Sequence, residues 1–404
     1  MPQLNRSDRV RGSLLGLAIG DALGAPLEGL SAQQIRAHYG QVDDYVDGSR
    51  AWKRKPYRWR MPGLYTDDTQ QALALTDVLL EHGAVDPDRL ARIYLDLATP
   101  RGSYVGAHRG VGRSFRHVLD QLDAGVSPRQ SGGTSAGIGA AMRIAPVGLF
   151  FAGRADEGAS GTSEAVFDAV MAASLITHRD VRSLAAASAV ARAVLMITEG
   201  DPRNPSFPLQ LAAEVARDEA RMAAEYPTGF LHVGGFSRSV PQAIARVESL
   251  LDLPRERALA AIVEEANRHG ADPVCKRPTM GFSPACIPTC VYLFMTTDTV
   301  EDALVEVVNM GGDSDSAGAI LGAMVGAYYG VDALPERWLA GLQNRDGIDA
   351  RGTALVARSL PAGPASIPDL IGREIELSGR EGACRESLLA HSQNGGDLGA
   401  NRRL

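Results

Sequence analysis

Two acidic clusters near opposite ends of the chain contain the residue types that bind hard divalent cations. The first is YTDDT at residues 65–69, and the second is GGDSDS at residues 311–316. Carboxylates, hydroxyls and water are the ligands that Mg²⁺ and Mn²⁺ prefer, and neither cluster contains His or Cys. Four carboxylates held close together repel one another unless cations neutralise them. The clusters therefore favour a shared site for two ions.

Each cluster taken alone has a simpler explanation. Both stand at the predicted start of a helix, where aspartate and threonine cap free N–H groups and complement the helix dipole. The second cluster does not continue as an EF-hand loop, because the required glycine and the distal glutamate are not in place. The metal interpretation depends on the two distant clusters meeting in space.

A third acidic segment is GDALGAPLE at residues 20–28. Asp21 interrupts an otherwise apolar helix, and a buried carboxylate is costly unless it is paired or hydrogen-bonded. We therefore expect Asp21 to accept hydrogen bonds that fix neighbouring loops. Glu28 follows Pro26 in the loop after this helix, and its spacing alone is also compatible with a solvated surface glutamate.

The elements that must position these residues are helices. Alternating β-branched runs are scarce, and no G-x-G-x-x-G motif follows a predicted strand, so the expected fold class is all-α. Ser7 is the expected N-cap of the first helix, Gly83 ends the second, and Asp86-Pro87 starts the third. The predicted helices cover residues 7–22, 68–82, 86–98, 163–176, 180–199, 208–225, 239–252, 255–269, 299–309 and 316–330.

Two of these helices carry glycine at every fourth position. The rows are Gly12, Gly16, Gly20 and Gly24 in the first helix, and Gly318, Gly322, Gly326 and Gly330 in the last. Such a row lies on nearly one face and lets another helix approach closely. Glycine inside a helix costs about 1 kcal/mol relative to alanine, so the rows indicate tight packing of two central helices. The acidic segments lie at the ends of these two helices.

The remaining segments are irregular. Residues 40–66 are predicted to form a long surface loop, residues 125–140 are rich in glycine and serine, and residues 200–208 form a linker. No break in composition divides the body of the chain. We expect one domain at residues 1–360, followed by a loosely attached C-terminal extension at residues 361–404.

Composition excludes several classes. Hydrophobic residues make up 45% and charged residues 22% of the 404 residues, which is typical of a soluble globular protein. A net charge of −7 argues against nucleic-acid binding through a broad basic surface. The four cysteines lack the spacing of a zinc site, and the uncharged stretch at residues 317–331 has 15 residues, fewer than the ~20 that a membrane span needs. We expect a cytoplasmic protein without a membrane segment.

Together, the three acidic segments resemble the ADP-ribosylglycohydrolase family, of the dinitrogenase-reductase-activating glycohydrolase type. The resemblance extends over about residues 8–345 and includes the order and spacing of GDALGAPLE, YTDDTQ and GGDSDSAGAI. It implies a compact single-domain bundle of helices with a binuclear centre, two Mg²⁺ or Mn²⁺ ions per chain, in a cleft. The ligands that the resemblance implies are Thr66, Asp67, Asp68, Asp313, Asp315 and Ser316.

The same resemblance implies roles for other residues. Glu28 matches a glutamate with an acid/base role, and Asp315 joins it as a catalytic residue. The segment GAAMRIAPVG at residues 139–148 resembles the part of the family that adjoins a diphosphate-holding loop, and Thr177-His178 resembles a further signature near the cleft. The substrate-binding residues implied are Gly137, Ile138, Gly139, Met142, Arg143 and His178. For Arg143, packing against a helix terminus remains an alternative, as does a structural hydrogen bond for His178.

Three positions depart from the family pattern. Ser316 stands where many members have threonine, which keeps the hydroxyl ligand. Ile138 stands where many members have asparagine, which removes a polar contact to the diphosphate. Residues 107–112 lack an aspartate that arginine-directed members carry, which weakens the case for ADP-ribosyl-arginine as substrate.

The resemblance implies a metal-dependent hydrolase that cleaves the glycosidic bond between ADP-ribose and a modified target. The cations would bind the ribose hydroxyls and lower the pKa of a water molecule, and the transition state would resemble an oxocarbenium ion. Glu28 would protonate the leaving group or manage the attacking water. One alternative is a metal-dependent hydrolase of another ribosyl compound, a nucleoside or nucleotide. Another is a non-catalytic, crystallin-like structural protein, which the presence of all four aspartates disfavours.

Overall fold

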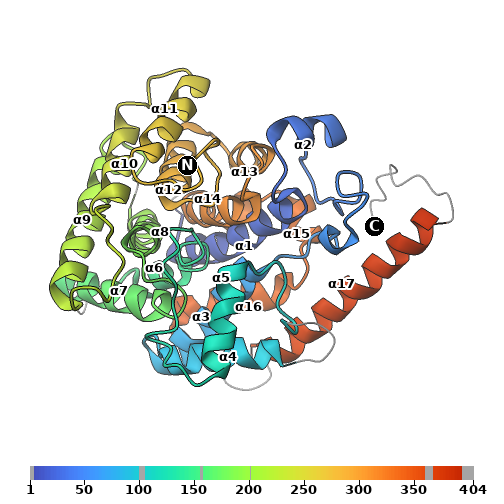
Figure 1. Ribbon diagram of the computed structural model, residues 1–404, viewed down its shortest axis with the longest axis horizontal. Coiled ribbons are helices and arrows are strands. Elements are labelled where there is room, and N and C mark those ends of the chain that lie inside the picture. The colour runs from blue at the N-terminus through green and yellow to red at the C-terminus, as the bar shows by residue number, and fades with distance from the viewer. Residues whose placement is uncertain (1–3, 100–104, 155–157, 201, 360–366, 394–404) are drawn as a thin grey trace.

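The computed structural model describes residues 4–99, 105–154, 158–200, 202–359 and 367–393 (Figure 1). Within these residues the secondary structure is helical, and β-structure is limited to isolated bridges, which confirms the all-α prediction. The α-helices are α1 (Arg6–Gly24), α2 (Ala32–Tyr39), α3 (Asp67–His82), α4 (Pro87–Ala98), α5 (Arg113–Asp123), α6 (Ala145–Phe151), α7 (Gly158–Ser174), α8 (Val181–Glu199), α9 (Phe207–Glu225), α10 (Ser239–Glu248), α11 (Arg255–Asn267), α12 (Ser283–Thr296), α13 (Val300–Asn309), α14 (Ser314–Tyr329), α15 (Glu336–Gly341), α16 (Arg345–Ala357) and α17 (Leu370–Gln393).

Helices α1 and α14 lie antiparallel in the middle of the molecule and meet along their glycine rows (Figure 1). A Cβ atom on Gly16 would lie 2.3 Å from the carbonyl oxygen of Gly322, so the backbones are in direct contact. The Ser13 hydroxyl reinforces this contact by donating to the Ala323 carbonyl at 2.8 Å. The predicted tight packing of two central helices is confirmed, and it places the end of α1 beside the start of α14.

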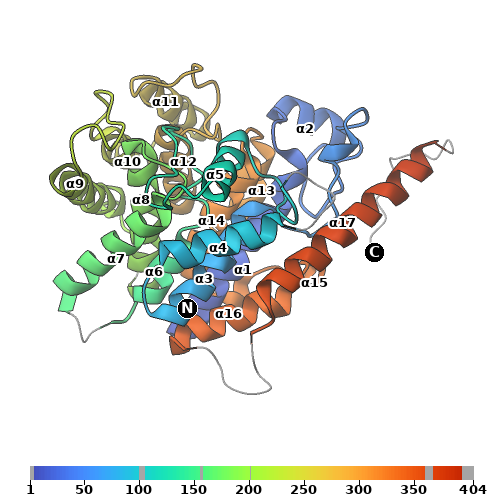
Figure 2. The same ribbon diagram turned by 60° about the horizontal axis from the view of Figure 1, so that its bottom comes forward.

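Other helices enclose this pair. Helices α3, α8, α12, α13 and α16 pack around it, and α9, α10 and α11 form an outer layer at one end of the molecule (Figures 1 and 2). By length and composition, α8 could cross a membrane, but 94% of its apolar window is buried inside the protein. Such burial is typical of the core helix of a globular protein.

The ten helices predicted from the sequence are all present, with shifted ends. The predicted N-cap of the first helix was wrong, because Asn5, not Ser7, accepts from the Asp8 N–H at 3.0 Å. The other helices in the described part of the chain were not predicted. Among them, α12 is buried on all sides and contains Pro288, so it lacks both an amphipathic pattern and a helix-like composition.

The segment at residues 40–66 was predicted to be a surface loop, yet part of it is buried. Trp59 is 1% exposed, and its indole N–H donates to the Trp52 carbonyl at 3.0 Å. The Trp52 indole in turn donates to the Pro26 carbonyl at 3.0 Å. The aromatic side chains therefore fasten this segment to the loop that follows α1.

The C-terminal extension also differs from the expected loosely attached segment. Helix α17 runs along the side of the molecule and packs against α3 and α4 (Figure 2). Glu374 and Leu377 on α17 are fully buried, so one face of the helix belongs to the body of the protein. The buried face of α17 could not be predicted from the sequence, because the charged residue Glu374 interrupts its apolar pattern. Residues 361–366 and 394–404 of the extension lie outside the described residues.

The helix contact predicts the effect of adding one methyl group. Gly16→Ala should lower the free energy of unfolding by about 3 kcal/mol or more, because the new Cβ atom would overlap the Gly322 carbonyl. Gly379→Ala on α17 is the matched control, since no heavy atom lies within 4 Å of the place that its Cβ atom would take. It should raise stability by about 0.4–1 kcal/mol. Urea unfolding measures both, and equal effects would contradict the proposed contact.

Candidate active site

The first link between the acidic segments is Asp21, near the end of α1. Its fully buried carboxylate accepts from the N–H groups of Thr66 and Thr69 at 2.9 Å and 3.0 Å. It also accepts from their hydroxyls at 2.8 Å and 2.6 Å. Burial raises the pKa of Asp21, and these four donors oppose that shift by stabilising the charged form. Asp21 therefore caps α3 from another helix, which confirms its predicted role as a hydrogen-bond acceptor.

A second link joins the loop after α1 to the loop before α14. The Gly29 N–H donates to the Gly312 carbonyl at 2.7 Å, and the Gly312 N–H donates to the Leu30 carbonyl at 2.8 Å. Gly311 and Gly312 have φ angles of 70° and 79°, in the left-handed region that favours glycine. This turn fixes the backbone beside Glu28 against the start of the second acidic cluster.

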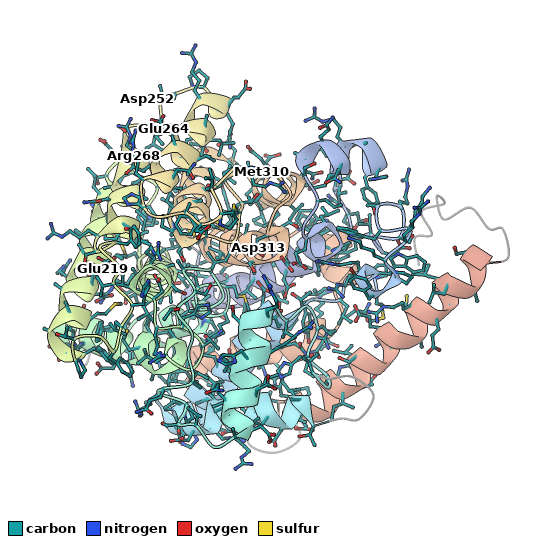
Figure 3. All side chains as sticks on the ribbon, viewed as in Figure 1. Glu219, Asp252, Glu264, Arg268, Met310 and Asp313 are labelled. Carbon is teal, nitrogen blue, oxygen red and sulfur yellow. The ribbon has the colours of Figure 1, made fainter. Side chains whose placement is uncertain are left out.

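These links bring the three acidic segments around one cavity of about 220 Å³. Asp313 lies near the centre of the molecule, far from the peripheral Asp252 and Glu264 (Figure 3). Thr66 is the one predicted site residue that does not line the cavity, since its hydroxyl faces Asp21 and lies 3.0 Å from Asp68. The predicted residues that do line it are Glu28, Asp67, Asp68, Asp313, Asp315, Ser316, Gly137, Ile138, Gly139, Met142, Arg143 and His178.

Helix capping does not account for the clusters. Neither the Thr66 side chain at the start of α3 nor that of Asp313 at the start of α14 makes a capping hydrogen bond. Asp67 accepts from the Gln71 amide at 2.8 Å, while Asp68 Oδ1 is buried and has no hydrogen-bond partner. A buried oxygen without a partner is costly, so these carboxylates are arranged for something other than their own helices.

The cavity brings together buried carboxyl groups that oppose one another's ionisation. Burial, followed by the charges of Asp21 and Glu28, raises the pKa of Asp67 to about 8. Burial and the Glu28 charge raise the pKa of Asp313 to about 6. Burial and the neighbouring carboxylates also raise the pKa values of Asp68 and Asp315 well above the usual range. Burial is the largest cause of each shift and neighbouring carboxylates add to it, while the Arg143 charge only partly opposes the shift of Asp67.

The donor set fits hard cations. The cavity offers carboxylates, the Ser316 hydroxyl and the unpartnered Asp68 Oδ1, which suit Mg²⁺ or Mn²⁺. Among the described residues, no group of three His, Cys, Asp or Glu side chains is already arranged to hold a metal ion. The carboxylates would therefore have to turn toward a common ion. The Asp313 carboxylate occupies space that is free because Gly281 has no side chain; a Cβ atom on Gly281 would lie 2.2 Å from Asp313 Oδ2.

Glu28 is held by a residue that the sequence did not single out. Arg58 Nη1 donates to Glu28 Oε2 at 2.8 Å, and the Arg58 guanidinium stacks over the Trp52 ring at 5.3 Å. Trp52 is itself tied to the Pro26 carbonyl. Glu28 is therefore oriented at the edge of the cavity and is not a free surface glutamate. The mixture of basic and aromatic residues in WKRKPYRW at residues 52–59 was the available signal.

The glycine-rich loop forms another wall. The Gly133 N–H donates to the Thr177 carbonyl at 3.1 Å, so the loop pairs with the segment after α7. The hydroxyls of Ser183 and Ser283 donate to the Gly137 carbonyl at 2.7 Å and 3.0 Å. Ile138 is 1% exposed and packs in the core, so its side chain brings no polar group to the cavity.

Arg143 and His178 form a network beneath this loop. Arg143 donates to the Gln71 side chain at 2.8 Å, the Gly139 carbonyl at 2.7 Å and the Thr177 hydroxyl at 2.6 Å. These contacts support the packing alternative for Arg143. Thr177 Oγ1 lies 2.7 Å from His178 Nδ1, and burial together with the Arg143 charge lowers the pKa of His178 to about 3. His178 is therefore a neutral imidazole at pH 7.

Several residues that line the cavity were not predicted. Arg113 and Ser114 stand exposed at the start of α5, where an arginine can meet a phosphate. Gly110 lies directly on the start of α3, since a Cβ atom there would be 2.9 Å from Thr66 Cβ. Their sequence context is an ordinary loop, so only the fold identifies them. Thr177, which the sequence placed near the cleft together with His178, also lines the cavity. The other unpredicted lining residues are Gln71, Gly112, Phe115, Ser135 and Gly281.

The described part of the chain is an all-helical fold with an acidic cavity beside its two central helices. Comparisons with known proteins show which protein family has this sequence and fold. The family profile described as ADP-ribosylglycohydrolase matches residues 2–365. The chain belongs to the ADP-ribosylglycohydrolase family and is a hydrolase of glycosidic bonds, as its sequence motifs predicted.

Individual relatives are distant but nearly full-length. The chain is 29% identical to the ADP-ribosyl-[dinitrogen reductase] glycohydrolase of Rhodospirillum rubrum, over 83% of this chain and 90% of the relative. It is 25% identical to the ADP-ribosylhydrolase ARH3 of Bos taurus, over 86% of this chain and 92% of the relative. A solved structure titled ADP-ribosylglycohydrolase-related protein complex has a TM-score of 0.59 and 28% identity, covering 88% of this chain and 99% of that one.

Because several carboxyl groups are buried close together, we expect the cavity to lower the free energy of unfolding of the metal-free protein. In the presence of a chelator, Asp68→Asn should raise the free energy of unfolding by about 1 kcal/mol or more, because an amide avoids the desolvation cost that raises the pKa of the buried Asp68 carboxyl. Asp252→Asn, at an exposed position remote from the cavity, should leave stability unchanged. Thermal unfolding of the two variants measures the difference. A less stable Asp68→Asn protein would mean that this carboxylate is already compensated.

Proposed function

We propose that this protein is a metal-dependent ADP-ribosylhydrolase that releases ADP-ribose from a modified target. The observation that carries the proposal is the convergence of three distant acidic segments on one cavity, which the glycine-rich loop also lines. Relatives named for action on ADP-ribosyl-dinitrogen reductase and on ADP-ribosylarginine support an ADP-ribosylated substrate.

The residues that would hold two Mg²⁺ or Mn²⁺ ions are the four aspartates of the acidic clusters and the Ser316 hydroxyl. Thr66 would join them only by turning its hydroxyl away from Asp21, to which it is now bonded. When bound, the cations would neutralise the carboxylates and supply Lewis-acid activation of the ribose hydroxyls and of a water nucleophile. Asp315 would also act in catalysis, because its carboxylate can stabilise positive charge that develops at the anomeric carbon.

Glu28 is the proposed acid/base group. Its carboxylate reaches the cavity from the loop after α1, and Arg58 holds it there by an ion pair. It can accept a proton from the attacking water or deliver one to the leaving atom of the target. The contact with Arg58 fixes its direction, so its proton transfer would take place at a defined position.

The walls of the cavity indicate how the substrate would lie. A volume of about 220 Å³ is below the ~300–1,000 Å³ of pockets that enclose whole small-molecule ligands. We infer that the cavity takes the ribose next to the scissile bond. Backbone N–H groups of residues 132–139 other than those of Gly133 and Gly137, which already donate to Thr177 and Ser135, would bind the diphosphate together with the start of α5, as loops and helix N-termini do.

A second candidate is hydrolysis of another ribosyl compound, a nucleoside or nucleotide. The observations that favour it are the apolar Ile138 and the absence of any acidic residue in the loop at residues 107–112. A panel of ADP-ribosylated arginine, serine and DNA, together with free nucleotides, separates the two. A crystallin-like structural role would instead be supported if calorimetry found no Mg²⁺ or Mn²⁺ binding at millimolar concentration.

Removing a ligand should abolish both binding and turnover. Asp315→Ala and Asp67→Ala should lose metal-dependent release of ADP-ribose and the cation-induced stabilisation of the fold. Wild-type protein should gain about 2.7 kcal/mol of stability at a cation concentration about one hundred times the Kd. Thermal unfolding with Mn²⁺ and with chelator measures this gain. Retained turnover in either variant would defeat the mechanism.

Removing the acid/base group should impair turnover and leave cation binding intact. Glu28→Gln should reduce kcat by about 10²–10⁴-fold, because general acid–base catalysis contributes that much. It should keep the cation-induced stabilisation, since the aspartates remain. Steady-state kinetics and thermal unfolding test the variant together. A normal kcat would remove Glu28 from the proposed chemistry.

A further inference from the structure

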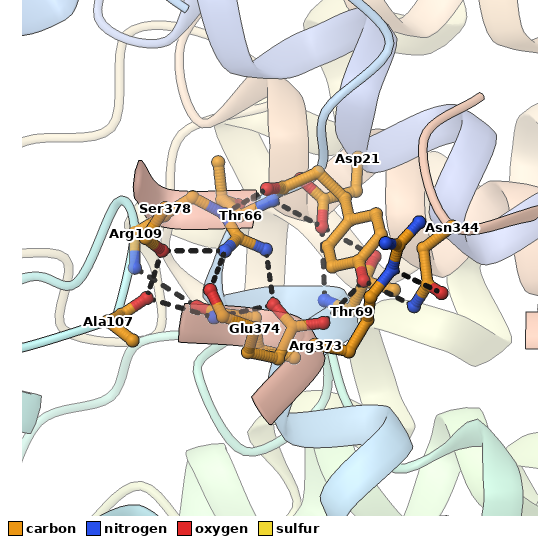
Figure 4. A network of polar contacts seen from close by, with 11 residues as sticks. Asp21, Thr66, Thr69, Ala107, Arg109, Asn344, Arg373, Glu374 and Ser378 are labelled. Carbon is orange, nitrogen blue, oxygen red and sulfur yellow. Dashed lines mark hydrogen bonds and ion pairs between the residues drawn. The ribbon is translucent and has the colours of Figure 1, made fainter. Parts of the chain in front are cut away.

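Helix α17 inserts one buried carboxylate behind the cavity. Glu374 has no exposed surface and accepts hydrogen bonds from three side chains of the body (Figure 4). The Tyr65 hydroxyl donates to it at 2.5 Å, the Gln70 amide at 2.8 Å and Arg109 Nη2 at 2.5 Å. All three donors come from the segments that form the cavity walls.

Each donor adjoins a position that the cavity uses. Tyr65 is the first residue of the first acidic cluster, which includes the cavity-lining Asp67 and Asp68. Gln70 directly follows the cluster and precedes Gln71, which also lines the cavity. Arg109 directly precedes Gly110, which lines the cavity and touches Thr66. Glu374 thus contacts the start of α3 and the loop at residues 107–112 at the same time.

The same network ties the two walls to each other. Arg109 Nε donates to the Tyr65 carbonyl at 3.0 Å, and the Arg109 N–H donates to Gln70 Oε1 at 3.0 Å. The guanidinium also stacks over the Tyr65 ring at 5.1 Å. From α17, the Ser378 hydroxyl donates to the Ala107 carbonyl at 2.7 Å and accepts from Arg109 Nη1 at 2.9 Å. Hydrogen bonds therefore join the two segments to each other and to α17.

We propose that Glu374 is a positioning residue of the active site, so that α17 contributes to the geometry of that site. The inference rests on the proposed function, because it assigns Glu374 the task of placing Thr66, Asp67 and Asp68 for cation binding. The family match ends at residue 365, before α17 begins. Stability alone does not explain the arrangement, since a buried ion pair is often no more stabilising than apolar residues of similar volume.

The experiment therefore separates positioning from stability. The paired variant Arg109→Met with Glu374→Met replaces the ion pair by apolar side chains, and Tyr65→Phe removes one hydroxyl from the network. Glu376→Gln is the matched control, because this glutamate lies on the same helix but faces solvent. Three readouts are taken: hydrogen exchange of residues 65–70 and 107–112 in metal-free protein, the Mn²⁺ Kd by calorimetry, and kcat and KM for ADP-ribose release.

The paired variant and Tyr65→Phe should exchange faster in these two segments and bind Mn²⁺ more weakly, by about 10–100-fold for the paired variant, the usual cost of losing an outer-shell partner. The fall in kcat at saturating Mn²⁺ should exceed any change in KM. Glu376→Gln should match wild type throughout. Wild-type exchange and Mn²⁺ affinity in the paired variant would overturn the inference.

If the paired variant does not fold, Tyr65→Phe decides the question by the same two criteria. Wild-type protein that binds Mn²⁺ but releases no ADP-ribose would defeat the proposed function alone. In that case exchange and Mn²⁺ affinity still report whether Glu374 positions the acidic cluster, so the two failures are distinguishable.

Discussion

The backbone contact between α1 and α14 is the constraint on which the rest of the structure depends. Two helices can approach this closely only where neither carries a side chain, and the glycine rows provide that condition along their length. The contact sets the end of α1 against the start of α14. Because Asp21 and Glu28 lie at and just beyond the end of α1, and Asp313 and Asp315 begin α14, this packing also determines where the carboxylates meet.

The buried carboxylates of the cavity destabilise the fold that brings them together. A folded chain gains stability by burying apolar surface, yet here it buries several carboxylates whose charges repel one another. Asp21 is compensated by four donors, whereas Asp68 retains an oxygen without any partner. The two aspartates therefore differ: Asp21 joins α1 to the start of α3, whereas Asp68 Oδ1 faces no hydrogen-bond donor of the described residues.

The sequence identified the acidic segments and the central helices because both have strong local signals: carboxylates at fixed spacing and glycine at every fourth residue. It did not identify Arg58, Arg113 or Glu374. Their roles depend on contacts between segments far apart in the chain, such as the ion pair between Arg109 and Glu374. Helix α12 was not predicted because it is buried on every side and therefore has no amphipathic periodicity.

The order of these segments along the chain bears on how the protein matures during translation. Helix α1 leaves the ribosome about 290 residues before its partner α14, and Glu374 on α17 follows later still. A nascent chain therefore carries Asp21 and Glu28 long before the opposite wall of the cavity exists. The cavity can therefore form only in a chain that includes both central helices, because residues at the end of α1 and at the start of α14 line it together.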